Sequence, residues 1–120
     1  AYKKTITERQ GKIRVIDNHN TDSVLRVVGK PLEMREVGAA DLPDEVLTDF
    51  PEATGGLYTK TQFLIDTPEG LGCFQRIAAG AINEWSIGYD ALDWDMGKFH
   101  NPATGKDEVV RNIRTIRLWE

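Results

Sequence analysis

The chain has 120 residues, 40% of them hydrophobic and 28% charged, which is typical of an ordinary globular domain with its own core. Its 15 basic and 19 acidic residues give a formal net charge of −4, which argues against proteins that bind nucleic acids or anionic membranes. The single cysteine, Cys73, excludes an internal disulfide and fits a reducing compartment, and no apolar run is long enough to span a membrane.

The amino-terminal part of the chain is predicted to contain short strands. Residues 12–16 and 23–28 have the composition of strands, and a polar loop, Asp17–Asp22, separates them. This loop carries His19 between two asparagines. A third strand is expected at 32–37.

The middle of the chain is predicted to hold one strand and one well-marked helix. Residues 57–65 are rich in Thr, Tyr, Phe and Ile, and they follow a segment of mixed signals at 38–56. The helix is expected at about 67–79, because Thr67 is a suitable N-cap and Gly80 can end a helix in a left-handed conformation. Glycines inside this helix lower its intrinsic stability, so it must depend on docking.

The last third of the chain is predicted to be two strands joined by a loop. In a long strand at 82–94, alternation places Ser86 and Gly88 together on a face that has little side-chain bulk. Residues 97–107 carry turn signals and are expected to form the loop. The final strand is expected at 109–120, with Glu120 directed toward an apolar face, where it would need a hydrogen-bonded partner.

These elements predict one mostly-β, α+β domain over residues 1–120, built as a curved sheet or barrel of about six strands with one helix. The three tryptophans are expected in its core. The chain starts without Met and stops inside a strand-like run, so it is expected to be trimmed at both ends. Two histidines and one cysteine are too few for a structural zinc site, and neither a metal nor another cofactor is expected.

A serine, a histidine and a carboxylate can together form a nucleophilic triad, and the candidates here are Ser86, His19 and Glu120. The imidazole takes the proton of the hydroxyl, and the carboxylate fixes the tautomer and stabilises the imidazolium. Spacing alone is a weak signal, because almost any chain contains such a trio. Each residue also has a simpler explanation. Ser86 could be a strand serine hydrogen-bonded across its sheet, His19 a solvated loop histidine, and Glu120 a charged chain end.

Four motifs occur in order along the chain: DNHN around His19, TPEG from Thr67, WSIGY around Ser86 and RTIRLWE ending at Glu120. In their order and context these motifs are similar to those of the tailed-phage prohead proteases, a family that resembles the herpesvirus assembly proteases in fold and mechanism. The resemblance covers roughly residues 12–120. The serine motif becomes considerably more specific with the helix before it and the strand after it.

The resemblance implies a herpesvirus-protease-like fold and a serine endopeptidase with Ser86 as nucleophile, His19 as general base and Glu120 as orienting acid. The face that carries Ser86 and Gly88 would then leave room for a substrate backbone. It implies cleavage of the phage scaffold, or of the scaffolding segment of the major capsid protein, and then of the protease itself. The enzyme would act without a cofactor inside the procapsid, in the cytoplasm of the infected bacterium. A homo-oligomer is compatible with this role, whereas nucleic-acid and membrane partners are not expected. Herpesvirus proteases use a histidine as third member, which makes His100 a reserve candidate.

Some expectations stay open. Backbone N–H groups of Gly88 or of the 97–107 loop could form the oxyanion hole, and the long segment 38–56 could be a lid or a wall of the substrate site. An inactive structural or scaffold-binding module with the same fold fits the sequence too. A third function is a carboxylate-based hydrolase that uses Asp90, Asp93 and Asp95.

Overall fold

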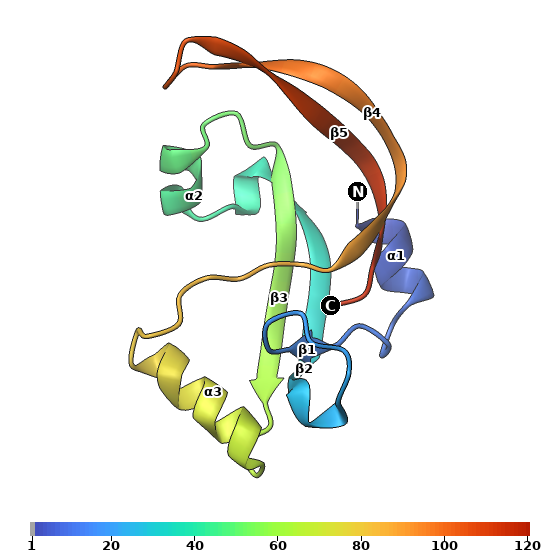
Figure 1. The fold of residues 1–120 in the computed structure, drawn as a ribbon, viewed down its shortest axis with the longest axis vertical. Helices are drawn as coiled ribbons and strands as arrows, with labels where there is room; N and C mark the ends of the chain where they lie inside the picture. Colours follow the sequence, from blue (N-terminus) through green and yellow to red (C-terminus); the bar gives the residue numbers. More distant parts are fainter. Residues whose placement is uncertain (1) are drawn as a thin grey trace.

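The computed structural model describes residues 2–120 (Figure 1). In chain order the elements are α1 (Lys3–Glu8), β1 (Val15–Ile16), η1 (Val24–Arg26), β2 (Val27–Gly38), η2 (Ala39–Asp41), α2 (Asp44–Asp49), β3 (Gly55–Phe63), α3 (Pro68–Ala78), β4 (Tyr89–Asn101) and β5 (Lys106–Leu118). None of the helices within residues 2–120 has the length and apolar character that crossing a membrane requires.

The strands form two antiparallel sheets, and the prediction of a mostly-β fold is confirmed. One sheet has the order β1-β2-β3, and the other is a two-stranded ribbon of β4 and β5. The ribbon arches away from the three-stranded sheet (Figure 1). The expected curved sheet or barrel of about six strands is not found within residues 2–120, because β4 and β5 pair with each other over their whole length and with no other strand.

Strand β2 corrects the prediction of two separate strands at 23–28 and 32–37. The chain forms a 3-10 turn at Val24–Arg26 and then one continuous strand. The register of β2 against β3 shifts next to Pro31. Proline has no N–H to donate, and it is tolerated in a strand at an edge or a bulge. Because β1 pairs with β2 only near Val27 and Gly29, Pro31 needs no second partner strand.

The helix predicted at 67–79 is confirmed as α3. The Thr67 hydroxyl accepts a hydrogen bond from the backbone N–H of Gly70 at 3.1 Å, and Gly80 has a φ of +74° just after the helix. Gly70 is buried, and a side chain there would overlap the carbonyl group of Leu64. This glycine therefore lowers the helix propensity but permits close docking of α3. The docking also places the ring of Phe74 of α3 5.8 Å from that of Phe63 of β3, at an angle of 51°.

Two predictions for the last third of the chain are wrong. Residues 82–88 cross the molecule as a drawn-out segment (Figure 1) that lies outside any sheet, so the strand begins at Tyr89 rather than near residue 82. The expected loop at 97–107 is mostly strand, because cross-strand pairing continues to Asn101 and Lys106 and leaves a turn of only four residues. The expected burial of the tryptophans is also wrong, since all three are between 42% and 65% exposed.

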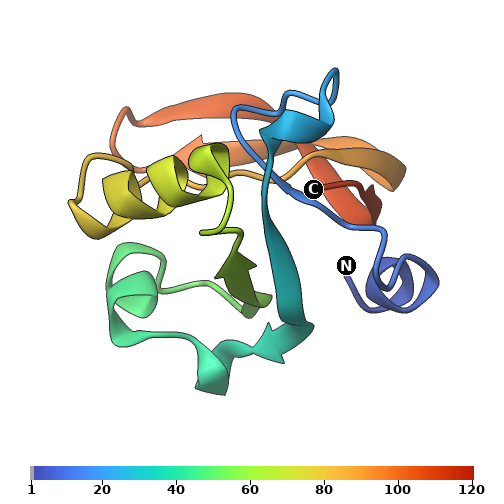
Figure 2. The ribbon, with the colours of Figure 1, turned by 90° about the horizontal axis from the view of Figure 1, so that it is seen from below.

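A small core fixes the end of β5. Ile13, Ile116 and Leu118 form its buried cluster, with Leu118 fully buried. The backbone N–H of Leu118 donates to the hydroxyl of Thr5 in α1 at 2.8 Å, and Thr5 itself is buried. In both Figure 1 and Figure 2, α1 lies beside the end of β5, on the opposite side of the molecule from α3. The last residues of the chain are thus held by contacts with its first residues.

Replacing Leu118 with alanine should destabilise the fold by about 2–5 kcal/mol, because it removes a fully buried side chain and leaves a cavity. The free energy of unfolding in urea measures this loss. Leu25→Ala is the matched control: Leu25 is 61% exposed, and its replacement should change stability by no more than about 0.5 kcal/mol. Equal losses in the two variants would contradict the assignment of the core.

Candidate active site

An open cleft of about 1290 Å³ lies between the three-stranded sheet, α3 and the extended segment 82–88. His19, Ser86 and Glu120 all line this cleft, although they come from the beginning, the last third and the end of the chain. The segment 38–56 contributes none of the lining residues, so it forms neither a lid nor a wall of this cleft.

His19 is carried by a tight turn after β1. Asn18 and His19 have φ values of 49° and 55°, and the backbone N–H of Asn20 donates to the carbonyl of Asp17 at 3.0 Å. Two consecutive positive φ values closed by this hydrogen bond are the pattern of a type I′ turn. Such a conformation costs of order 1–3 kcal/mol for each residue other than glycine, so its surroundings must hold it. The ion pair of Asp17 with Arg26, at 3.0 Å, helps to do so.

Glu120 contacts the imidazole of His19. Its Oε1 lies 2.6 Å from Nδ1 of His19. The glutamate side chain is 11% exposed and that of the histidine 50% exposed. A carboxylate can only accept, so this contact places a proton on Nδ1 and leaves Nε2 of a neutral ring as the acceptor. The Oε2 atom of Glu120 is buried and has no hydrogen-bond partner within residues 2–120.

The backbone around Glu120 is anchored on three sides. Gly88 exchanges backbone hydrogen bonds with it: the N–H of Trp119 donates to the Gly88 carbonyl at 2.8 Å, and the N–H of Gly88 donates to the Glu120 carbonyl at 3.2 Å. The backbone N–H of Arg14 donates to the carbonyl of Trp119 at 3.3 Å. The guanidinium of Arg9 stacks on the Trp119 ring, 3.9 Å from its centroid. These contacts fix the carboxylate in front of His19.

Gly88 does not provide the open space for a substrate that its position near Ser86 predicts. A methyl group on Gly88 would overlap the carboxylate of Glu120 and would lie 2.7 Å from its Cγ. The space over Gly88 is therefore filled by Glu120 and is not free for a substrate backbone. Because its N–H already donates to the carbonyl of Glu120, Gly88 is also not a free oxyanion donor.

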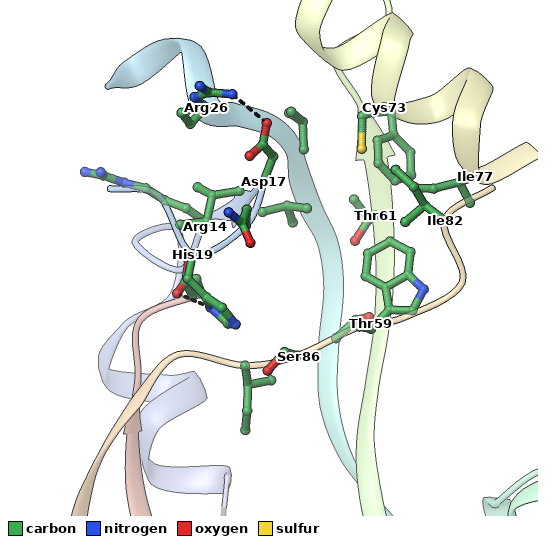
Figure 3. A pocket seen from close by; sticks show the side chains of 18 of the residues that line it. Arg14, Asp17, His19, Arg26, Thr59, Thr61, Cys73, Ile77, Ile82 and Ser86 are labelled. Atoms are coloured by element: carbon green, nitrogen blue, oxygen red, sulfur yellow. Dashed lines mark hydrogen bonds and ion pairs between the residues drawn. The ribbon is translucent and has the colours of Figure 1, made fainter. Parts of the chain in front are cut away.

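Ser86 lies in the extended segment and is exposed. The next residue, Ile87, packs with Tyr89 against the buried core, so alternation directs Ser86 away from it. No acceptor or donor within residues 2–120 is hydrogen-bonded to the Ser86 hydroxyl, so it is not a serine bonded across a sheet. Figure 3 shows the imidazole of His19 directed into the cleft, toward the segment that carries Ser86.

The reserve candidate, His100, lies away from the cleft. Its Nδ1 is 2.8 Å from Oδ1 of Asp107, near the turn that joins β4 and β5. No residue of 97–107 lines the cleft, so this segment does not supply the oxyanion hole expected of it.

The three aspartates of β4 make hydrogen bonds with side chains of β5 and of Trp119, which follows it. Arg114 is 2.7 Å from Asp93 and 2.5 Å from Asp95, and its hydrogen bonds hold the pKa of both carboxyls below the usual range. Asp90 accepts a hydrogen bond from the indole N–H of Trp119 at 2.9 Å. None of the three lines the cleft, and a carboxylate-based hydrolase needs an acid whose pKa is raised. Within residues 2–120 there is also no group of side chains suited to a metal ion.

The other wall of the cleft was not predicted from the sequence. This wall is mostly apolar and comes from β3, α3 and the segment that follows α3. Its apolar side chains are those of Phe63, Cys73, Ile77, Ile82 and Trp85, and the uncharged side chains of Thr59 and Thr61 of β3 line the cleft beside them. Apolar side chains at helical and strand spacing indicate packing, and nothing in their pattern distinguishes a residue that lines a cleft from one in the core.

A model of a known protein family matches the chain. The family model for the caudovirus prohead serine protease matches residues 47–120, which is more than half of the chain and includes Ser86 and Glu120 but not His19. No curated protein matches the chain, and no solved structure does. On the extent of the family match, this chain belongs to the caudovirus prohead serine proteases, the serine proteases of phage capsid maturation.

Proposed function

We propose that this chain is the catalytic part of a serine endopeptidase in which Ser86 is the nucleophile, His19 the general base and Glu120 the orienting acid. The 2.6 Å contact of His19 with Glu120, in the cleft that Ser86 also lines, is the observation that carries the proposal. The herpesvirus-protease-like architecture belongs to the same proposal. The proposed substrates are the phage scaffold or the scaffolding segment of the major capsid protein, and then the protease itself. These cleavages would take place inside the procapsid, in the host cytoplasm.

The proposed reaction has two halves. Nε2 of His19 takes the proton of the Ser86 hydroxyl while Oγ attacks the carbonyl carbon of the scissile peptide bond. The tetrahedral intermediate collapses when the imidazolium gives that proton to the leaving amine, which breaks the C–N bond and leaves an acyl-enzyme. Water, deprotonated by the same nitrogen, then hydrolyses the ester. The Glu120 carboxylate stabilises the imidazolium at each stage through Nδ1.

Two features of the free protein support this mechanism. The Ser86 hydroxyl has no competing partner within residues 2–120, and catalytic hydrogen bonds often tighten only when substrate binds. The backbone N–H groups of residues 83–87 donate to no acceptor in the described part of the chain. They are therefore available beside the nucleophile to bind the oxyanion or the backbone of a substrate.

Labelling with a fluorophosphonate tests the proposal, because the chain contains only two serines, Ser23 and Ser86. We expect covalent label on Ser86, located by peptide mass spectrometry, and its loss in Ser86→Ala. Ser23→Ala is the matched control and should label like the parent chain, since Ser23 does not line the cleft and its hydroxyl accepts from the N–H of Leu25 at the start of η1. A folded chain that takes no label, or takes it elsewhere, would overturn the proposal and favour an inactive structural module.

Gly88→Ala should slow the labelling of Ser86 by about 100-fold, because the new methyl group must displace the carboxylate of Glu120 from its contact with His19. Gly38→Ala is the matched control. No atom lies within 4 Å of a methyl group placed on Gly38, and its φ is −85°, so this variant should label at the parent rate. An unchanged rate in Gly88→Ala would show that the position of the carboxylate does not matter.

A further inference from the structure

The two walls of the cleft differ in chemistry. Figure 3 shows Arg14, Asp17 and His19 on one side, and the side chains of Cys73, Ile77 and Ile82 on the other. Ser86 lies between the two groups (Figure 3). The polar wall holds the proposed general base, so the apolar wall is the part of the cleft left to receive a substrate side chain.

Trp85 makes the apolar wall accessible to a ligand. It directly precedes Ser86 and is 65% exposed, and its ring centroid is 6.4 Å from that of Phe63 at an angle of 56°. Phe63 is itself 5.8 Å from Phe74 of α3. The ring contacts orient the indole without covering it, and an exposed aromatic side chain beside a nucleophile leaves apolar surface for a ligand to cover.

The rest of this wall favours an uncharged group. Burial raises the pKa of the Cys73 thiol, which stays neutral and behaves as a small apolar side chain. Three charged residues from α3 and the segment after it also line the cleft: Glu69, Arg76 and Glu84. Two carboxylates and one guanidinium form no concentrated charge of either sign, so they provide no basis for selecting an acidic or a strongly basic side chain.

We propose that this apolar wall is the specificity subsite of the enzyme, and that its substrates carry a bulky apolar side chain next to the scissile bond. The inference rests on the proposed function. Because Trp85 directly precedes Ser86 and both residues line the cleft, a side chain that lies on the indole belongs to a residue at the bond that Ser86 attacks or beside it. Apolar pockets discriminate by about 10- to 200-fold for each methylene group that they accommodate.

Peptidyl diphenyl phosphonates test this inference, because Ser86 Oγ attacks their phosphorus and displaces phenoxide. The series differs only in the side chain next to phosphorus: that of Ala, Leu, Phe, Lys or Glu. An alkyl fluorophosphonate without a side chain serves as the reference. We expect the Leu and Phe compounds to label Ser86 at least 10-fold faster than the other three.

The Trp85→Ala variant should lower the ratio of Leu to Ala labelling rates by about 10-fold. Dividing each rate by that of the fluorophosphonate in the same variant removes any change in the reactivity of Ser86 itself. Trp94→Ala is the matched control: Trp94 is 46% exposed on β4 and does not line the cleft, so the ratio should stay as in the parent chain.

The outcomes separate the inference from the function on which it rests. If the fluorophosphonate labels Ser86 but the Leu and Phe compounds react no faster than Ala, Lys or Glu, the apolar subsite is wrong and the serine protease remains. A parent chain that no compound labels overturns both. An unchanged ratio in Trp85→Ala, with a parental circular dichroism spectrum, would also overturn the subsite.

Discussion

Replacing His19 with alanine should slow the acylation of Ser86 by about four to six orders of magnitude, the loss typical of serine proteases without their general base. The expected loss follows from the contact between the side chains of His19 and Glu120. Glu120 occupies Nδ1 and leaves Nε2 as the acceptor for the serine proton. Without this acceptor the hydroxyl must lose its proton to water, and it is a weak nucleophile at neutral pH. The rate of fluorophosphonate labelling measures the loss.

The chain provides its own control for this experiment, because it has only one other histidine. His100→Ala should label within about twofold of the parent rate, since His100 pairs with Asp107 near the far turn of the ribbon and does not line the cleft. If His100→Ala lost as much activity as His19→Ala, the assignment of the general base would be wrong. If both variants kept the parent rate, the triad itself would be wrong.

The sequence motifs indicated candidates for the triad, but not the geometry of these residues. Motifs indicated His19, Ser86 and Glu120, and the fold brings all three to one cleft although 101 positions separate the first from the last. The left-handed backbone at Asn18 and His19 was not predicted, because such a turn usually contains glycine. The side chain of His19 is held here by Glu120, 101 positions later in the chain, and local propensity does not encode this contact.

Gly88 shows how a local rule can explain a residue wrongly. Alternation along a strand made Gly88 part of an open face beside Ser86. In the structure, the space that a side chain on Gly88 would occupy is filled by Glu120, which lies 32 positions later in the chain. A pattern of period two describes which residues share a face within one strand, but it carries no information about what approaches that face. The need for glycine is therefore visible only after folding.

The prediction of a loop at 97–107, where β4 and β5 continue, was wrong for a related physical reason. Residues 97–107 are polar and contain Asn-Pro and Thr-Gly, so they have the composition of a loop. Side-chain pairs across β4 and β5, among them His100 with Asp107 and Asn101 with Glu108, nevertheless accompany the strand pairing almost to the turn. Because the ribbon is mostly exposed near its turn, residues 97–107 lack the alternation of apolar and polar residues by which half-buried strands are recognised.

The Glu120→Gln variant should label about 10,000-fold more slowly than the parent chain, although glutamine has nearly the same shape. An amide at this position can donate to Nδ1 of His19, which would move the imidazole proton to Nε2, the nitrogen that must accept from Ser86. It also carries no charge to stabilise the imidazolium. Glu108→Gln is the matched control, because Glu108 lies near the far turn of the ribbon, where it accepts from Asn101. A Glu120→Gln rate within about 10-fold of the parent rate would mean that the carboxylate does not orient the base.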